Sequence, residues 1–495
     1  MAIAMPPWPP TLDAEARRFG AQLTALYGAD HGTHVAGPVD VLGWVRWGSE
    51  YRFHRAALSH DDAWQQIRDS ILGIWGAASP VPVPAPGGPV RPIRGYTRTF
   101  GRSFGDDSGP RILHGGSWFP ALVIAHQDFD AFRRQLDRTV PYWQYHRWLW
   151  RLNGWKWTES GLTIDPIRDP WFEETLRTAL LEAKARGLRV NLSSGDMNDW
   201  SDSQAEHWFR RVAEIARDVD EQTVWLHAIT NEMAGTWRPG ETDANVARGA
   251  DLLRIVTGIY PWNHHAVSDP ESRDKAGMQR ITPAPATAAL IHDLRWMSDH
   301  DRDISHAIRR AFNTMYENYP GRPIVQDEPA GPNGTFTGPY SHLVYQPFER
   351  PADLFPLYTM HVLTGQASTY FSDPALLSRQ PLDSTWGAKE LPTLWRAMAI
   401  PENIGQGALT PGHKSDAPIR IGSGADRCDS VIAPGGTVAF GIVHGGRDWN
   451  VPSGWDAEAT FFRADGSVTA KTVRAGETLL HTVGTHDPVV VRLTR

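Results

Sequence analysis

The sequence has little of what marks several protein classes. Its 495 residues include one cysteine, Cys428, which excludes an intramolecular disulfide and any zinc cluster built on cysteines. No stretch approaches about 18 uninterrupted apolar residues, so we expect no membrane span. Basic residues are not in excess, because the chain has 49 Lys and Arg residues and 56 Asp and Glu residues. The net charge of −7 argues against a nucleic-acid binder, which would usually carry a basic stripe.

Tryptophan and proline, in contrast, are abundant, with 22 and 38 residues. Hydrophobic residues make up 41% and charged residues 21%, which predicts a large core rather than a disordered chain. Six of the prolines fall within residues 80–92, PVPVPAPGGPVRP. Because proline fixes φ and donates no hydrogen bond, residues 80–93 are predicted to form an extended, semi-rigid linker and the clearest domain boundary.

Residues 1–79, before this linker, are predicted to form a small helical module. Thr11 can cap a first helix that Gly28 closes, and a second helix follows Ser59 with apolar residues at helical spacing. One interpretation is a packed pair of helices. The other is a module that docks to another protein, and the sequence leaves both open.

Residues 94–410 alternate short apolar runs with amphipathic stretches. Eight runs are predicted to be strands, at 111–119, 141–150, 187–196, 223–232, 263–269, 286–296, 322–329 and 367–373. Predicted helices between them cover 128–138, 171–186, 203–216, 243–256, 305–319 and 354–363. Alternating strands and helices imply a parallel sheet, and eight such units fit a (β/α)8 TIM barrel. In such a barrel the functional residues lie at the C-terminal ends of the strands.

Residues 411–495 have a different pattern, with strand-like runs separated by glycine, proline and Asp-Gly turns. The turn at Asp465-Gly466 lies between two alternating runs, which is a strong hairpin signal. We predict an antiparallel β-sandwich of about seven or eight short strands. The fold class is therefore α/β, with a barrel between a helical module and a β-sandwich.

Histidine motifs predict neither a protease nor a metal site. The segment HGTHVAG at 31–37 is similar to the histidine box of subtilisin-like proteases, but no serine box or upstream aspartate box accompanies it. His31 and His34 have no third ligand nearby, and His264 and His265 have no identifiable metal-binding partners. We therefore expect no metal and no cofactor.

Two predicted strands each end in a carboxylate. The fourth strand runs into Asn231-Glu232 and the seventh into Asp327-Glu328. In a parallel barrel both ends open onto the same rim. Glycoside hydrolysis usually requires two carboxylates that face one cleft. The alternative is structural, with Glu232 paired to an arginine and Glu328 in a solvated turn before Pro329.

This pattern resembles the clan A glycoside hydrolases, which have Asn-Glu ending strand four and Glu ending strand seven. The segment FGDDSGPRILHGGSWFPAL at 104–122 is similar to their opening hairpin and first strand. The resemblance covers about residues 95–410 and implies that Glu232 is the acid/base and Glu328 the nucleophile.

The same resemblance implies roles for three further residues. Asn231 would donate to the sugar 2-hydroxyl, Arg147 would be the strand-two arginine, and His292 would be the strand-six histidine. The chain departs from the pattern at NLSSGD (191–196), where many members carry a histidine, and at Leu294, where a tyrosine is usual. No particular family or sugar follows from it.

Several tryptophans fall at or just past the predicted strand ends. Indole rings stack on the flat C–H faces of sugars, and the candidates for such stacking are Trp118, Trp148, Trp150, Trp237 and Trp296. For any one of them, packing in the core or barrel wall is the competing interpretation.

The sequence thus supports two functional hypotheses. The first is a retaining O-glycosidase that cleaves a poly- or oligosaccharide. The second is a glycan-binding or structural component, for example of a phage particle, with little or no turnover on the same barrel. The first residues, MAIAMPPWPP, lack the basic and apolar regions of a secretory signal. We therefore expect a cytoplasmic protein or a component of a virus particle.

Overall fold

The computed structural model describes residues 90–495 with gaps. The residues outside the description are 1–89, 102, 154–160, 196, 230–241, 262–263, 270–286, 292–322, 329–350, 372–380, 383–385, 411–419, 422–429, 444–448, 451–455, 475–477 and 480–488. The chain divides into two compact units, Met1–Pro82 and Val83–Arg495, and all described residues belong to the second. The predicted helical module at 1–79 and most of the predicted linker lie outside the description and stay predictions.

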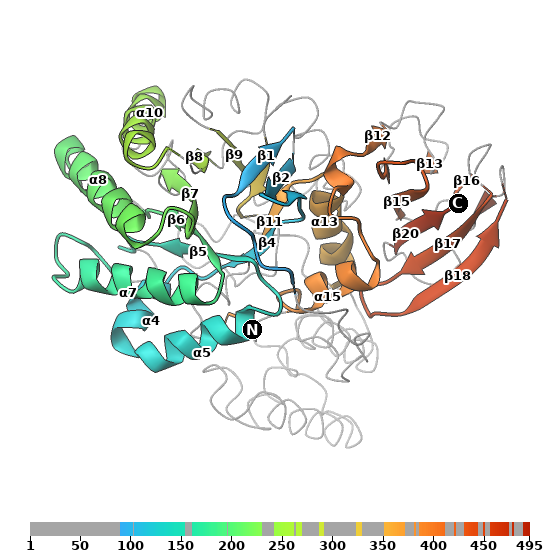
Figure 1. The fold of residues 1–495 in the computed structure, drawn as a ribbon, viewed down its shortest axis with the longest axis horizontal. Helices are drawn as coiled ribbons and strands as arrows, with labels where there is room; N and C mark the ends of the chain where they lie inside the picture. The colour runs from blue at the N-terminus through green and yellow to red at the C-terminus, as the bar shows by residue number, and fades with distance from the viewer. Residues whose placement is uncertain are drawn as a thin grey trace, which may run out of the picture. The chain divides into compact units, whose positions relative to one another are not determined.

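Eight parallel strands close into a barrel, as the sequence predicts (Figure 1). They are β4 (His114–Ser117), β5 (Tyr145–Leu149), β6 (Arg189–Ser193), β7 (Val224–Ile229), β8 (His264–Asp269), β9 (Ala289–Ile291), β10 (Ile324–Gln326) and β11 (Ala367–Tyr370). Each strand pairs with its neighbours in the chain, and the pairing of β11 with β4 closes the ring. Each of the eight predicted segments contains one of these strands.

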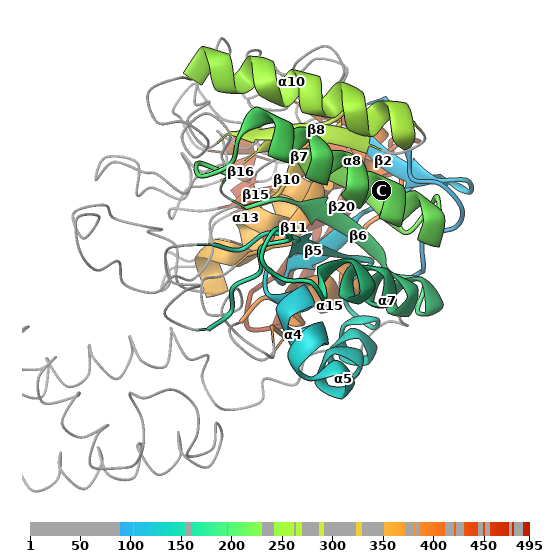
Figure 2. The ribbon, with the colours of Figure 1, turned by 90° about the vertical axis from the view of Figure 1, so that its left-hand side faces the viewer.

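Helices follow most of the described strands and cover the outside of the barrel (Figure 2). They are α4 (Ala121–Gln127), α5 (Phe129–Thr139), α7 (Phe172–Ala185), α8 (Asp202–Val219), α10 (Thr242–Ile259), α13 (Pro351–Leu363) and α15 (Glu390–Ala397), with a 3-10 turn at Ile404–Gln406. Local caps explain two of the starts. Asp128 accepts the Ala131 N–H before α5, and Ser201 forms a capping box with Gln204 before α8. Helix α4 was not predicted, and the helix predicted at 305–319 lies outside the description.

The N-terminal end of the barrel is closed by a small antiparallel sheet. It consists of β1 (Arg98–Phe100), β2 (Ser103–Asp106) and β3 (Gly109–Pro110). Phe104 packs edge-to-face on Trp225 and on His264, with ring centroids 5.2 and 5.0 Å apart. Because Trp225 and His264 lie near the first residues of β7 and β8, this sheet covers the end opposite the C-terminal rim. A site for a large substrate is therefore expected at the other end.

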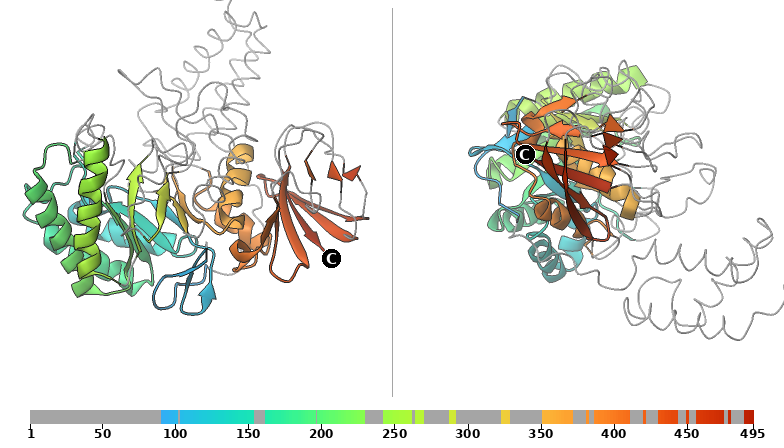
Figure 3. Two further views of the ribbon diagram at one scale, coloured as in Figure 1. Left: turned by 90° about the horizontal axis from the view of Figure 1, so that it is seen from above. Right: turned by 90° about the vertical axis from the view of Figure 1, so that its right-hand side faces the viewer.

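Two antiparallel sheets follow the barrel (Figure 3). The six-stranded sheet has the order β12-β14-β15-β20-β17-β18, and a three-stranded sheet has the order β13-β16-β19. Their bounds are β12 (Ala408–Thr410), β13 (Arg420–Ile421), β14 (Ser430–Ile432), β15 (Val438–Val443), β16 (Trp449–Asn450), β17 (Ala457–Phe462), β18 (Val468–Val473), β19 (Thr478–Leu479) and β20 (Val489–Thr494). The predicted Asp465-Gly466 turn joins β17 to β18. The first strand begins at Ala408, slightly before the predicted boundary at 411.

One hydrophobic cluster joins the barrel to the six-stranded sheet. Leu354 and Leu357 of α13 belong to the same buried cluster as Phe440 of β15 and Val490 of β20. In Figures 1 and 3 α13 lies beside this sheet. In the part of the chain that the structure describes, no helix is long and apolar enough to cross a membrane.

Candidate functional site

A buried arginine joins the second and seventh strands of the barrel. Arg147, on β5, has no exposed surface. Its Nε lies 2.7 Å from Oδ2 of Asp327, and its Nη1 donates to Oε1 of Glu328 at 2.5 Å. Asp327 and Glu328 directly follow the last residue of β10 and are 0% and 1% exposed. The arginine therefore gathers two carboxylates just beyond the C-terminal end of the seventh strand.

Asp327 is also held from the third strand. Asn191, on β6, is paired in register with Arg147 and donates from Nδ2 to Oδ1 of Asp327 at 2.8 Å. Ser193 donates from Oγ to Oδ1 of Asn191 at 3.4 Å. One Asp327 oxygen thus meets the arginine and the other meets the asparagine, so the orientation of this carboxylate is fixed from both sides.

An aromatic ring covers the guanidinium of Arg147. The guanidinium carbon lies 4.6 Å from the ring centroid of Phe119, which follows β4 in the chain. Phe119 in turn contacts Phe371, just past β11, with centroids 6.4 Å apart. A cation over a desolvated aromatic face gains further stabilisation. The first and eighth strands therefore help to hold the arginine in place.

The electrostatic character of the site follows from its formal charges. One guanidinium and two ionised carboxylates leave a net negative charge among Arg147, Asp327 and Glu328. The guanidinium forms a charge-assisted hydrogen bond with the Glu328 carboxylate. An ionised carboxylate at a strand end can act as a nucleophile or stabilise a cation that develops on a substrate.

Two of the sequence-predicted site residues, Arg147 and Glu328, are brought into contact by the structure. The alternative of Glu328 in a solvated turn is wrong, because its side chain is buried against Arg147. Asn231, Glu232, His292, Trp237 and Trp296 lie outside the described residues, so their roles stay predictions. Glu232 is the third residue after the end of β7 at Ile229.

The sugar-stacking role is corrected for the three described tryptophan candidates. Trp118, Trp148 and Trp150 are 0%, 0% and 1% exposed. Trp118 stacks on Phe132 of α5 at 5.5 Å, and Trp150 meets Phe209 of α8 edge-to-face at 5.1 Å. These rings fill the layer between strands and helices, so no sugar face can reach them and the packing interpretation holds.

Three buried histidines are unsuited to proton transfer near neutral pH. Burial lowers the pKa of His114, His146 and His361 to about 3 in each case. His114 donates from Nδ1 to the carbonyl of Ser368 at 2.9 Å. These rings are therefore neutral parts of the packed barrel.

The sequence analysis did not assign roles to Asn191, Asp327 and Phe119. Asp327 was visible beside Glu328, and Asn191 stood in the segment that departs from the clan A pattern. Asn191 could have been identified from its position on the predicted third strand. Side chains that point into the barrel from this strand lie beside those of the strand that carries Arg147. Among the described residues, no group of three or more His, Cys, Asp or Glu side chains is placed to hold a metal ion.

Replacing Arg147 by lysine is expected to lower the free energy of unfolding by about 1–3 kcal/mol. An ammonium is a compact donor and cannot meet both carboxylates and Phe119 at once, so one buried charge loses its partner. Urea unfolding of Arg147→Lys measures the effect. The matched control is Arg254→Lys, because Arg254 pairs with Asp251 on the surface, where both side chains are more than 60% exposed. Equal, small effects of the two substitutions would contradict this account.

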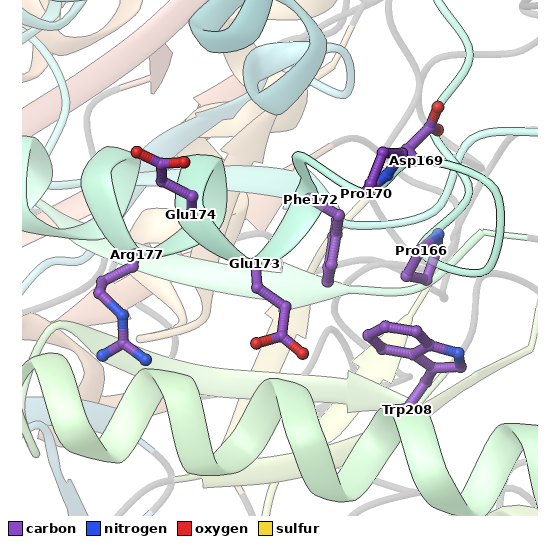
Figure 4. Close-up of a pocket in the computed structure, with 8 residues that line it drawn as sticks. All are labelled: Pro166, Asp169, Pro170, Phe172, Glu173, Glu174, Arg177 and Trp208. Atoms are coloured by element: carbon purple, nitrogen blue, oxygen red, sulfur yellow. The ribbon is translucent and has the colours of Figure 1, made fainter.

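A pocket of about 430 Å³ lies on the outer surface, between α7 and α8 (Figure 4). It is lined by Pro166, Asp169, Pro170, Phe172, Glu173, Glu174, Arg177 and Trp208. Figure 4 shows the Glu173 carboxylate directed toward α8. Glu173 accepts two hydrogen bonds from Arg211, at 2.8 and 2.5 Å, and these bonds lower its pKa. The residues that line this pocket include none of those that contact Arg147.

Comparison with known proteins finds a similar fold in solved structures of glycoside hydrolases. No model of a known protein family matches the chain, and no curated protein matches it. Among solved structures, a glycoside hydrolase has a TM-score of 0.55 and 13% identity over 81% of this chain and 96% of its own. A second, a putative glycoside hydrolase from Bacteroides vulgatus, has a TM-score of 0.52 and 12% identity over 81% and 82%.

The chain has a glycoside hydrolase fold. The resemblance to clan A glycoside hydrolases that the sequence predicts is confirmed at the level of the fold, with a parallel barrel followed by antiparallel sheets. At 12–13% identity the likeness is one of fold.

Proposed function

We propose that the chain is a retaining glycoside hydrolase that cleaves O-glycosidic bonds in a poly- or oligosaccharide. Glu328 is the nucleophile and Glu232 the acid/base. The observation that carries the proposal is the buried Glu328 carboxylate at the end of the seventh strand, held at 2.5 Å by Arg147. The glycoside hydrolase fold supports it independently.

The chemistry proceeds in two steps. A Glu328 oxygen bonds to the anomeric carbon while the bond to the leaving oxygen breaks, and Glu232 gives its proton to that oxygen. Glu232 then takes a proton from water, the water oxygen bonds to the anomeric carbon, and the bond between that carbon and Glu328 breaks. This two-step reaction requires the two carboxyl groups to lie about 5–5.5 Å apart.

The charge of the site suits this reaction. The transition state at the anomeric carbon resembles an oxocarbenium ion, which is positively charged. The net negative charge among Arg147, Asp327 and Glu328 stabilises such a cation in a setting with little water. Asn231 supplies a hydrogen bond to the sugar 2-hydroxyl. Because Arg147 also fixes the Glu328 oxygen, less reorganisation is needed as the bond forms.

A glycan screen with product analysis tests the proposal. The full chain is incubated with a panel of polysaccharides and aryl glycosides, and released sugar is followed by proton NMR from the first minutes. We expect hydrolysis of at least one substrate with retention of anomeric configuration in the first product. Inversion would refute the retaining mechanism. Tight glycan binding without release of sugar would support the non-catalytic alternative.

A further inference from the structure

We propose that Asp327 and Asn191 are positioning residues that direct the guanidinium of Arg147 toward Glu328. This inference rests on the proposed function, because it assigns the means by which the nucleophile is held. Asp327 meets Nε of Arg147 at 2.7 Å, whereas Glu328 accepts from Nη1 at 2.5 Å. The two carboxylates therefore contact different nitrogens of the same planar group.

The rigidity of the guanidinium links these two contacts. Its five N–H donors lie in one plane in a fixed arrangement, so anchoring Nε determines where Nη1 points. The arginine side chain itself has many rotamers. The Asp327 contact selects the rotamer that places Nη1 against Glu328, while Phe119 fixes the plane of the group.

Asn191 completes the arrangement by preventing Asp327 from turning. Its Nδ2 donates to the Asp327 oxygen that does not face Arg147, at 2.8 Å. Asn191 and Arg147 are in register on adjacent strands, so the backbone of the barrel sets the distance between them. The chain of contacts therefore runs from β6 through Asp327 to Arg147 and then to Glu328.

The same contacts separate the roles of the neighbouring carboxylates. Both oxygens of Asp327 are engaged by groups of the barrel, and its side chain is fully buried. A nucleophile must direct an oxygen at the anomeric carbon. Asp327 is thus suited to hold Arg147, and the proposed function assigns the nucleophile to Glu328.

Asp327→Asn tests the inference most directly, because it keeps the shape of the side chain and removes its charge. An asparagine can still accept the hydrogen bond from Nδ2 of Asn191, but it carries no charge to form the ion pair with Nε of Arg147. The ion pair that anchors the Nε side of the guanidinium is lost, so Arg147 is held less firmly in the orientation that meets Glu328. We expect kcat to fall by about 100-fold, as misplacement by about 1 Å can cost, with the glycan Kd unchanged.

Asn191→Ala is the second variant, since it leaves all charges in place and removes only the amide that holds Asp327. We expect a smaller fall in kcat, again with unchanged glycan Kd. Asp327→Asn added to Glu328→Gln should have no further effect on turnover, because both act through the same nucleophile. Asp106→Asn is the matched control. Asp106 is a fully buried aspartate of β2, 2.8 Å from Arg111, at the opposite end of the barrel. It is expected to lower stability and leave kcat unchanged.

Crystal structures of both variants give a readout that is independent of activity. We expect the contact between Nη1 of Arg147 and Oε1 of Glu328 to be lost or lengthened in Asp327→Asn. Retention of this contact together with full kcat would overturn the inference. Loss of turnover in Asp327→Asn with activity retained in Glu328→Gln would make Asp327 the nucleophile and also overturn it. If the wild-type chain hydrolyses no glycan, the proposed function fails, and the crystal structures still decide whether Asp327 and Asn191 hold Arg147.

Discussion

Glu328→Gln is expected to lower the rate of glycan hydrolysis by on the order of 10⁴-fold or more. Glutamine has the shape of glutamate and can still accept a hydrogen bond from Nη1 of Arg147, so the fold and the glycan Kd should be kept. Its amide cannot form the covalent bond to the anomeric carbon. The measurement is kcat on the best substrate of the screen, with Kd from calorimetry.

The matched control is Glu221→Gln. Glu221 is exposed and accepts a hydrogen bond from the Tyr96 hydroxyl at 2.7 Å, so it serves as a glutamate away from Arg147. We expect its kcat to equal that of the wild type. Hydrolysis that survives Glu328→Gln would show that the nucleophile has been assigned to the wrong residue.

Glu232→Ala gives the complementary signature of an acid/base. Removing the proton donor should slow the release of poor leaving groups far more than that of good ones, because good leaving groups need no protonation. A small anion such as azide should partly restore turnover, since it can attack the glycosyl-enzyme without a general base. A uniform loss across leaving groups, with no rescue by azide, would exclude this role for Glu232.

Acidification from pH 7.5 to pH 5.5 is expected to lower the free energy of unfolding by about 4 kcal/mol through three histidines. Burial lowers the pKa of His114, His146 and His361 to about 3, against about 6.5 in the unfolded chain. Between these values the unfolded chain binds three more protons than the folded one. The stabilisation is therefore complete above about pH 6.5 and is lost progressively as the pH falls toward 3.

His361→Leu isolates one of these contributions. His361 lies on α13 with no exposed surface, and neither ring nitrogen has a hydrogen-bond partner among the described residues. Leucine removes the titrating group, so the loss of stability between pH 7.5 and 5.5 should shrink by about 1.4 kcal/mol. Urea unfolding at the two pH values measures it. His207→Leu, at an exposed position on α8, is the surface control for the substitution. An unchanged pH dependence in His361→Leu would contradict the buried neutral state.

Much of the barrel could be predicted from the sequence because its pattern is local. Apolar runs such as RPIVQDEP alternate with amphipathic segments, and counting them places Glu328 at the end of the seventh strand. Arg147 was identified by the resemblance to clan A glycoside hydrolases, which implies an arginine on the second strand. The sheets after the barrel were predicted from turns such as Asp465-Gly466, which set their register within a few residues.

What could not be predicted depends on contacts between distant segments. Trp148 lies on β5 and Trp150 directly follows it, where side chains alternate between the barrel interior and the helices. Only the packed helices show that both rings are covered. The contact of Asn191 with Asp327 joins residues 136 positions apart. No local pattern encodes such a contact, because it exists only once the barrel has closed.

The order of strands in the six-stranded sheet has a consequence for synthesis of the chain on the ribosome. Strand β20 is the last of these strands to be made, yet it lies between β15 and β17. Until it emerges, the β14–β15 and β17–β18 hairpins each present an unpaired edge, and such edges can pair with other chains. The apolar face that receives α13 is also incomplete, because Val490 belongs to it. Nascent chains should therefore be prone to aggregation until β20 has joined the two halves of the sheet.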